Sequence, residues 1–152
     1  MYQRILVPVD GSPTSTRGLE EAIRLAALTG GSIHLVHVSE ELKYMTGFET
    51  YAPDVRDIVR EAGRLVLEQA RTLTAAGGID ATTFLSDPFH GRICDVILEQ
   101  AGQIRADLIV LGTHGRRGVR RLFIGSDAEQ IVRMADVPVL LVRGQDAGMT
   151  PT

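Results

Sequence analysis

The segment from Gly112 to Ser126 holds the residues of this 152-residue chain that are best suited to bind an anion. Gly115 follows Gly112 after two residues, and Gly125 and Ser126 follow after nine more, in the form G-x2-G-x9-G-S. Glycine lets the backbone approach an oxyanion and present its N–H groups. A helix beginning near Ser126 adds unpaired N–H donors and the positive end of its dipole, and the serine hydroxyl can donate to the same group. The spacing therefore predicts a phosphate-binding loop.

The same residues also allow a purely structural interpretation. Gly112 and Gly115 can form a turn, and Gly125 can permit a tight entry into the helix. Ser126 and Glu129 have the spacing of a capping box, in which the serine side chain satisfies its own helix. The local sequence leaves both interpretations open.

Four arginines crowd into six positions of this segment, namely Arg116, Arg117, Arg120 and Arg121. They could close over a phosphate as a charge clamp, with Arg116 touching the ligand first, or lie in a solvated loop or in salt links between subunits. Nucleic acid is not the expected partner, because the net charge is −3 and no aromatic platform accompanies the arginines. The one lysine, Lys43, follows no glycine, which excludes the Gly-Lys-[Ser/Thr] of a P-loop.

Asp10 is the second candidate for chemistry. It directly follows an apolar run that ends at Val9 and precedes Gly11. Its carboxylate could ligate Mg²⁺ together with phosphate oxygens and water. It could equally form a turn by accepting a hydrogen bond from its own backbone.

The histidines and the single cysteine do not have the spacing of a metal-binding or catalytic site. The histidines, His34, His37, His90 and His114, are scattered and indicate no metal site, although His114 lies inside the glycine-rich segment. Cys94 is expected on the apolar side of a helix as a small buried hydrophobic residue. A single cysteine cannot form an internal disulfide, which is typical of a reducing compartment.

The elements that must position these residues alternate between strand and helix. Short apolar, β-branched runs predict strands near residues 4–9, 32–38, 80–85, 107–112 and 138–143. Amphipathic segments predict helices near residues 13–29, 54–76, 91–105 and 126–134. Strands joined by helices in this way are parallel, and the sheet is covered on both faces. The polar strand 80–85 is expected at an edge.

Length and composition indicate a single domain over residues 1–144, followed by a disordered tail at 145–152. Residues 39–53 form an unusually long connection, which is typical of a mobile or functional loop. No apolar run approaches the roughly 20 residues of a membrane span, and no signal peptide is evident, so we expect a cytoplasmic protein.

In open parallel sheets, ligands bind at the carboxyl ends of the strands, where Asp10 and Gly112 would meet.

The glycine-rich segment, the opening RILVPVDGS and the closing PVLLVR together resemble the universal stress protein family in its ATP-binding subgroup. The resemblance covers nearly the whole chain. It implies an α/β fold with an open five-stranded parallel sheet of order 3-2-1-4-5 and helices on both faces, in the Rossmann-like class. It also implies a cytoplasmic homodimer that binds ATP.

The resemblance also implies roles for individual residues. Those that border the adenine and ribose would be Pro8, Val9, Asp10, Val38, Leu111 and Gly112. Those that hold the phosphates would be Gly115, Arg116, Gly125, Ser126 and the amide of Asp127. Asp127 departs from the family pattern, where valine is frequent. Its carboxylate would repel a triphosphate unless a divalent cation or the arginines offset it.

Several functions remain open at this stage. The first is an ATP-binding regulatory module. The second is a slow ATPase or phosphotransferase, for which Asp10, His114 and Asp127 are the candidate bases. The third is a nucleotide-free interaction protein, and a flavin or AMP binder is a more distant alternative. The apolar strand from Val139 to Val142 would be an exposed edge, which predicts pairing with a second copy of the chain.

Overall fold

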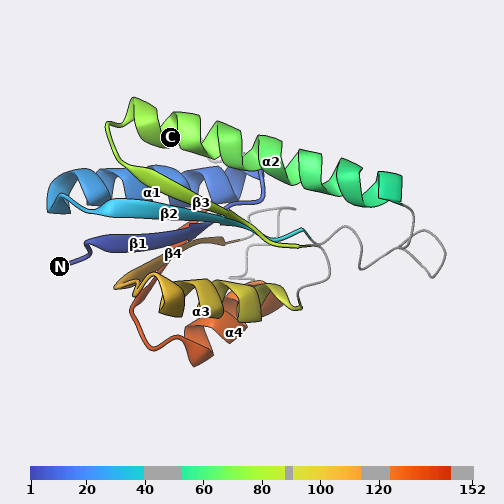
Figure 1. The fold of residues 1–152 in the computed structure, drawn as a ribbon. Helices are drawn as coiled ribbons and strands as arrows, with labels where there is room; N and C mark the ends of the chain where they lie inside the picture. The colour runs from blue at the N-terminus through green and yellow to red at the C-terminus, as the bar shows by residue number, and fades with distance from the viewer. Residues whose placement is uncertain (40–52, 88–90, 114–123, 145–152) are drawn as a thin grey trace, which may run out of the picture.

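The computed structural model describes residues 1–39, 53–87, 91–113 and 124–144. Within these residues the chain forms one five-stranded parallel sheet of order β3-β2-β1-β4-β5 (Figure 1). The strands are β1 (Arg4–Pro8), β2 (Ser32–His37), β3 (Ala81–Leu85), β4 (Leu108–Thr113) and β5 (Val139–Arg143). The helices are α1 (Pro13–Thr29), α2 (Pro53–Ala76), α3 (Ile93–Gln103) and α4 (Ser126–Met134). The predicted fold class and strand order are confirmed.

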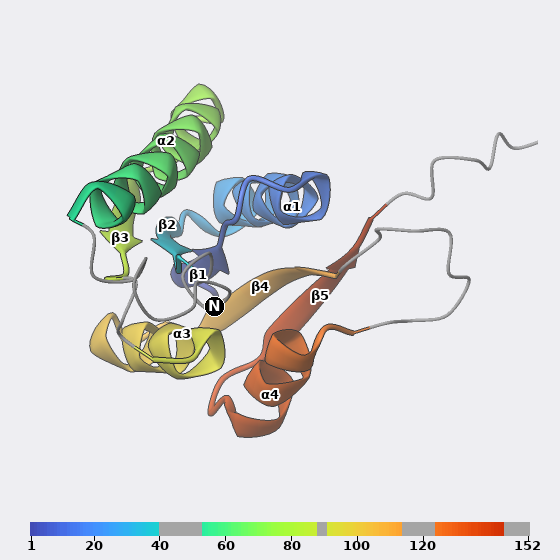
Figure 2. The same cartoon turned by 90° about the vertical axis from the view of Figure 1, so that its right-hand side faces the viewer.

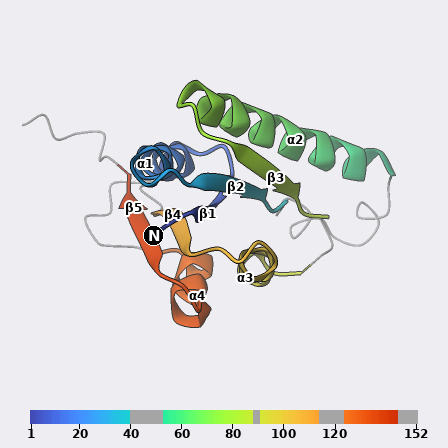
Figure 3. The ribbon, with the colours of Figure 1, turned by 60° about the vertical axis from the view of Figure 1, so that its left-hand side comes forward.

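The helices cover both faces of the sheet. Figure 2 looks onto the carboxyl ends of the strands, with α1 and α2 on one face and α3 and α4 on the other; Figure 3 shows the same layers from a third direction. Residues 40–52 of the loop predicted at 39–53, and the tail predicted at 145–152, lie outside the described residues. No helix in the described ranges has the length and apolar content needed to cross a bilayer.

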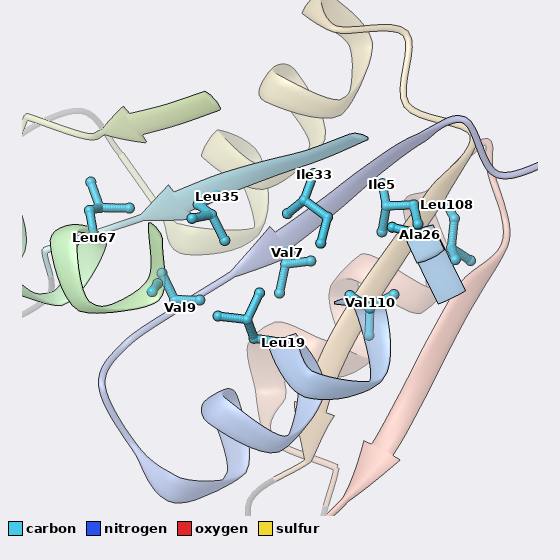
Figure 4. Close-up of a cluster of buried hydrophobic side chains, with 12 residues drawn as sticks. Ile5, Val7, Val9, Leu19, Ala26, Ile33, Leu35, Leu67, Leu108 and Val110 are labelled. Atoms are coloured by element: carbon cyan, nitrogen blue, oxygen red, sulfur yellow. The ribbon is translucent and has the colours of Figure 1, made fainter. Parts of the chain in front are cut away.

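Successive side chains of the central strand β1 point to opposite faces of the sheet, and the hydrophobic core is accordingly divided into two clusters. Ile5 and Val7 of β1 are fully buried under α1 and α2, where they pack with Leu35 and Leu19 (Figure 4). Leu6, between them, is fully buried against α3 and α4. Successive side chains of a strand point to opposite faces, so a central strand covered on both sides must be apolar at every position. This is why β1 is recognisable in the sequence.

The two edge strands differ in character. β3 pairs only with β2, and its middle residues are exposed, which confirms the predicted polar edge. β5 pairs only with β4 and lies at the opposite edge. Leu140, the second residue of β5, remains 37% exposed. An apolar strand with one unpaired side is therefore left open at this edge of the described chain.

The first helix begins as the sequence predicts. Ser12 is its N-cap and accepts a hydrogen bond from the amide of Ser15 at 3.2 Å, while Pro13 occupies the first turn, where no intrahelical N–H is needed. Gly30 ends the helix at φ 72°, a left-handed conformation that favours glycine.

Of the two interpretations left open for the start of α4, the capping box is wrong. The N-cap is Gly125, and Ser126 is already the first helical residue, without a side-chain cap hydrogen bond. The amide of Glu129 donates to the carbonyl of Gly125 at 2.9 Å, and the Glu129 carboxylate pairs with Arg133 instead. The helix starts one residue earlier than a capping box requires, which moves the serine side chain out of reach of that role.

Gly112 is glycine because α1 packs directly on the backbone of β4. A Cβ atom at position 112 would overlap the carbonyl of Thr14, in the first turn of α1. Gly18, one turn further along α1, makes the matching approach, since a Cβ there would lie 3.0 Å from the amide nitrogen of Gly112. Two glycines thus bring helix and strand into backbone contact.

We expect Gly112→Ala to lower the free energy of unfolding by about 3 kcal/mol, because the added methyl meets backbone that cannot move aside. Gly102→Ala in α3 is the matched control, since a Cβ there meets nothing within 4 Å. Removing that helical glycine should leave stability unchanged or raise it by up to about 1 kcal/mol. Urea unfolding of both variants measures the difference, and similar values for the two would contradict this packing.

Candidate site: a cavity at the carboxyl ends of the strands

β1 and β4 separate toward their carboxyl ends. The pairing of β1 with β2 runs along the whole strand from Arg4 to Pro8, whereas the pairing with β4 covers only Ile5 and Leu6 of β1. The first turn of α1 comes down onto β4 in the space beyond, at Gly112. The two strands therefore part where the chain turns from β1 into α1.

A cavity of about 320 Å³ opens at this place. Its walls come from the carboxyl ends of β1, β2 and β4, from the starts of α1, α3 and α4, and from α2. The residues that line it are Pro8, Val9, Asp10, Ser12, Thr14, Ser15, Val36, His37, Val38, Ser39, Val59, Ala62, Val66, Ile93, Ile97, Leu111, Gly112, Asp127, Ala128 and Ile131.

Most of the predicted site residues meet at this cavity. The lining includes seven of them, which are Pro8, Val9, Asp10, Val38, Leu111, Gly112 and Asp127. Gly125 and Ser126 directly precede Asp127 at the start of α4, and Ser126 is exposed. Gly115 and Arg116 lie outside the described residues, as do His90, His114 and the other three arginines of the cluster.

Three helices present their N-terminal turns to the cavity. α1 contributes Ser12 and Ser15, α3 contributes its first residue, Ile93, and α4 contributes Asp127 and Ala128. The N-caps of α3 and α4 make no side-chain hydrogen bond to their helices. The first N–H groups of a helix are unpaired and carry the positive end of its dipole. This end of the cavity is therefore suited to a negatively charged group.

Asp10 forms a turn and lines the cavity at the same time. Its Oδ1 accepts a hydrogen bond from the amide of Ser12 at 2.8 Å, and its own amide donates to Ser15 Oγ at 3.1 Å. The turn interpretation of the sequence is thus confirmed in its geometry. Asp10 is nevertheless exposed and borders the cavity.

Asp127 has a cation within electrostatic reach. The pKa of the Arg92 guanidinium is raised, first by its hydrogen bond to Asp95 and by the charge of Asp95, and to a lesser extent by the charge of Asp127. Arg92 Nε lies 2.9 Å from Asp95 Oδ2. In the sequence, only the arginines of the glycine-rich segment indicated a positive charge that could offset the carboxylate of Asp127. Arg92 is distant from Asp127 in the chain, and the packing of α3 beside α4 brings the two residues near each other.

The cavity lining also has an apolar component. α2 contributes Val59, Ala62 and Val66, and α3 contributes Ile93 and Ile97. The amphipathic pattern of this segment predicted a helix, and it gave no sign that Val59, Ala62 and Val66 line a cavity. Aliphatic side chains from two helices in the lining are suited to contact a largely apolar group.

Among the polar lining residues that were not predicted from the sequence are His37 and Ser39. His37 Nδ1 donates to the carbonyl of Val9 at 2.7 Å, and α2 packs against the imidazole at Gly63, where a Cβ would lie 2.8 Å from His37 Cδ2. Ser39 is buried, and its hydroxyl has no hydrogen-bond partner within the described part of the chain. Their signal in the sequence is position alone, since both flank Val38 at the end of the second strand.

The described residues hold no group of three or more His, Cys, Asp and Glu side chains that could bind a metal ion by itself. Asp10 and Asp127 are two carboxylates on one cavity, and a Mg²⁺ ion usually takes one or two carboxylates together with phosphate oxygens and water. The residues present therefore fit a cation that arrives with a phosphate. Cys94 is 1% exposed in the α3 core, as predicted.

The two roles of Asp10 can be separated in the ligand-free protein. Asp10→Asn keeps an oxygen that accepts from Ser12, so we expect its free energy of unfolding to lie within about 0.5 kcal/mol of the original value. Asp10→Ala removes the acceptor and should cost about 1 kcal/mol. Urea unfolding measures both. Equal losses in the two variants would mean that the charge of Asp10, and not its turn, supports the fold.

Comparison with known proteins agrees with the fold and the motif. The model of the universal stress protein family matches residues 1–143. The universal stress protein YxiE of Bacillus subtilis is 30% identical over 151 residues, covering 94% of this chain and all of that protein. A universal stress protein family structure from Burkholderia pseudomallei is 32% identical at a TM-score of 0.75, covering 93% of this chain and 96% of the other. A universal stress protein of Archaeoglobus fulgidus, solved with dAMP, is 25% identical at a TM-score of 0.67, covering 92% and 97%. The chain therefore belongs to the universal stress protein family.

Proposed function

We propose that this protein binds an adenine nucleotide, with ATP as the principal ligand, in the cavity at the carboxyl ends of β1, β2 and β4. The observation that carries the proposal is one cavity with two kinds of wall. Three helix N-termini contribute to its lining, and so do aliphatic side chains of α2 and α3. A nucleotide has the matching division into phosphates and base.

The base would lie against the aliphatic side chains of α2 and α3. Val38 follows the end of β2, and its side chain packs against the core cluster that contains Ile97 of α3. Its main chain would then meet the edge of an adenine in the cavity. Leu111 and Gly112 would flank the ribose, and Asp10 with the backbone of Pro8 and Val9 would border the nucleoside. The closeness of α1 to Gly112 gives this part of the cavity a wall made of backbone.

The phosphates would lie at the start of α4. The amides of Ser126 and Asp127 belong to an N-terminal turn without a side-chain cap, and the exposed Ser126 hydroxyl is free of the capping role. Gly115, Gly125 and Arg116 complete the proposed phosphate loop. Mg²⁺ held between Asp10 or Asp127 and the phosphate oxygens would offset the repulsion between like charges.

The relatives support the same class of ligand. The Archaeoglobus fulgidus protein was solved with dAMP, and it matches this chain over nearly its whole length. The resemblance of the G-x2-G-x9-G-S segment to the ATP-binding subgroup of the family supports a triphosphate as the ligand. The family membership also supports a cytoplasmic role in the response to stress.

A regulatory role fits the described groups better than catalysis on a second substrate. Phosphoryl transfer needs a residue that positions the attacking nucleophile. One oxygen of Asp10 is engaged by Ser12, and Nδ1 of His37 is engaged by Val9. We therefore infer that nucleotide occupancy changes the protein's assembly or its partner surface, with slow ATP hydrolysis at most. A nucleotide-free interaction protein is the second candidate, favoured by the Asp127 carboxylate at the anion end.

We expect protein that is purified without added nucleotide, and then denatured, to release ATP or ADP. Gly125→Val should abolish this release and weaken ATP binding by at least about tenfold, because the side chain blocks the approach of a phosphate. Gly125 has φ −56° and ψ 154°, which any residue adopts, so backbone strain does not confuse the result. Gly102→Ala in α3 is the control and should retain the nucleotide.

Three outcomes would contradict this function. No calorimetric binding at high ATP and Mg²⁺ would favour the nucleotide-free interaction protein. Multiple-turnover hydrolysis that is lost in Asp10→Ala would make the protein an enzyme. A yellow protein that absorbs in the flavin bands would identify a different cofactor.

We further propose a homodimer formed through Val139 to Val142, in which the unpaired side of β5 meets its symmetry mate. Light scattering at micromolar concentration should give a dimer, and Leu140→Lys should give a monomer that keeps its fold, because this side chain is already partly exposed. Leu65→Lys, on the exposed side of α2, is the control and should stay dimeric. A monomeric original protein would overturn the proposal.

A further inference from the structure

The outer side of β3 is an open sheet edge in the described part of the chain. β3 pairs with β2 and with no other described strand. At its two ends, the carbonyl of Asp80 and the amide of Ser86 bond to β2, at 3.0 and 2.9 Å. Backbone groups of successive strand residues point to opposite sides, so the N–H and C=O groups of Ala81, Thr83 and Leu85 point outward.

β3 carries none of the residues that usually protect an open edge. Such protection comes from a lysine, a proline or a bulge. The sequence of β3 is ATTFL, its residues pair one to one with β2, and Thr82 and Thr83 are exposed. The strand therefore offers outward N–H groups and carbonyls to a further strand. Peptides that bind by β-augmentation use an edge of this kind.

Two arginines of α2, Arg60 and Arg71, flank this edge. α2 packs on β3, since a Cβ at Gly63 would lie 2.7 Å from Leu85 Cδ1, and Figure 2 shows the helix above that strand. Arg60 Nη2 lies 4.0 Å from Asp87 Oδ2, just beyond the carboxyl end of β3. Arg71 follows after eleven residues, which is close to three helical turns, so it lies on the same side of α2.

The two arginines are available to a partner. Arg71 is exposed and forms no ion pair or hydrogen bond within the described ranges. The Arg60 side chain is 56% exposed, and its 4.0 Å contact with Asp87 is too long for a hydrogen bond. Arg64, between them, differs because two glutamates of the same helix hold its guanidinium at 2.7 and 3.0 Å. Two cations therefore lie beside the open backbone groups.

These charges disfavour a second copy of this chain at the same edge. In a symmetric antiparallel pairing of β3 with β3, the two α2 helices would lie side by side on one face of the joined sheet, with their arginines facing each other. Like charges that face each other across an interface are unfavourable. Carboxylates are the favourable partners, because arginine can bind a carboxylate through two parallel hydrogen bonds.

We propose that the outer edge of β3 binds an extended, acidic segment of another protein as a sixth strand. Ala81, Thr83 and Leu85 supply the backbone hydrogen bonds, and Arg60 and Arg71 pair with carboxylates on the α2 side of the segment. Alternate side chains of a strand share a face, so an acidic residue at every second position meets this requirement. Among the described residues, none of β3 lines the cavity, so the inference is independent of the proposed function.

The first test uses the original protein and synthetic heptapeptides, with fluorescence anisotropy as the measurement. Val-Glu-Val-Glu-Val-Glu-Val should bind at least about tenfold more tightly than the same peptide with lysine in place of glutamate. Two further peptides are N-methylated, one at the glutamates and one at the valines. Only alternate residues of an added strand face β3, so one of these two should bind at least about fivefold more weakly and the other should not.

The second test reverses one charge. Arg71→Glu should weaken the acidic peptide about tenfold and strengthen the lysine peptide, because an attractive pair becomes a repulsive one. Arg105→Glu is the matched control. Arg105 is likewise exposed and unpaired within the described ranges, and it lies between α3 and β4, on the far side of β2 and β1 from β3. This control should leave both affinities within about twofold.

Amide hydrogen exchange identifies the backbone groups. With the acidic peptide bound, the amides of Thr83 and Leu85 should exchange at least about tenfold more slowly, whereas those of Thr82 and Phe84, which face β2, should change little. Thr83→Pro removes one outward N–H and spares the pairing with β2, so it should weaken the peptide at least about fivefold. Thr83→Val keeps the N–H and should bind as the original protein does.

Several outcomes would overturn the proposal. They are no binding of the acidic peptide, equal binding of the lysine peptide, equal effects of the two N-methylations, or unchanged exchange at Thr83 and Leu85. A dimer that Thr83→Pro disrupts would assign the edge to a second copy. A single-stranded oligothymidylate that binds through Arg71 and displaces the peptide, without slowing exchange in β3, would assign the arginines to nucleic acid. The nucleotide release described above is unaffected by any of these results.

Discussion

The parting of β1 from β4 is the constraint on which the rest of the site depends. β1 lies between β2 and β4, and the helices that follow β1 and β4 leave on opposite faces of the sheet. The two strands pair only over Ile5 and Leu6 of β1. Beyond that point no strand fills the gap, and the starts of α1, α3 and α4 surround it. An opening at this place is a general property of parallel sheets whose strand order reverses.

The architecture was predictable because its signals are local and repeated. β1 is apolar at every buried position, β3 is polar enough for an edge, and Ser12 with Pro13 marks the start of α1. The details of the site depend on contacts between segments that are distant in the chain. The fit of α1 onto Gly112 and the wall formed by α2 belong to this class. The capping box at α4 failed for a different reason, since a shift of one residue changes which side chain caps a helix.

The charges around the cavity oppose one another in a way that composition alone does not reveal. Helix N-termini attract an anion, yet Asp10 and Asp127 place two carboxylates on the same cavity. Arg92 lies near enough to Asp127 for their charges to interact, although its hydrogen bond to Asp95 has the larger effect on it. A ligand with phosphates must therefore displace, neutralise or bridge these carboxylates, and a divalent cation is the simplest bridge.

Three of the cavity-lining residues, Val36, Ile97 and Ile131, are also among the most deeply buried side chains of the described chain. The same side chains belong to the cluster that holds α3 and α4 on the sheet, so the cavity wall is continuous with the core. Evolution could not reshape this pocket for a bulkier or smaller guest without loosening the scaffold, because truncating such residues leaves voids and enlarging them forces neighbours apart. Diversification within this architecture should therefore concentrate at the rim, where side chains are free to vary.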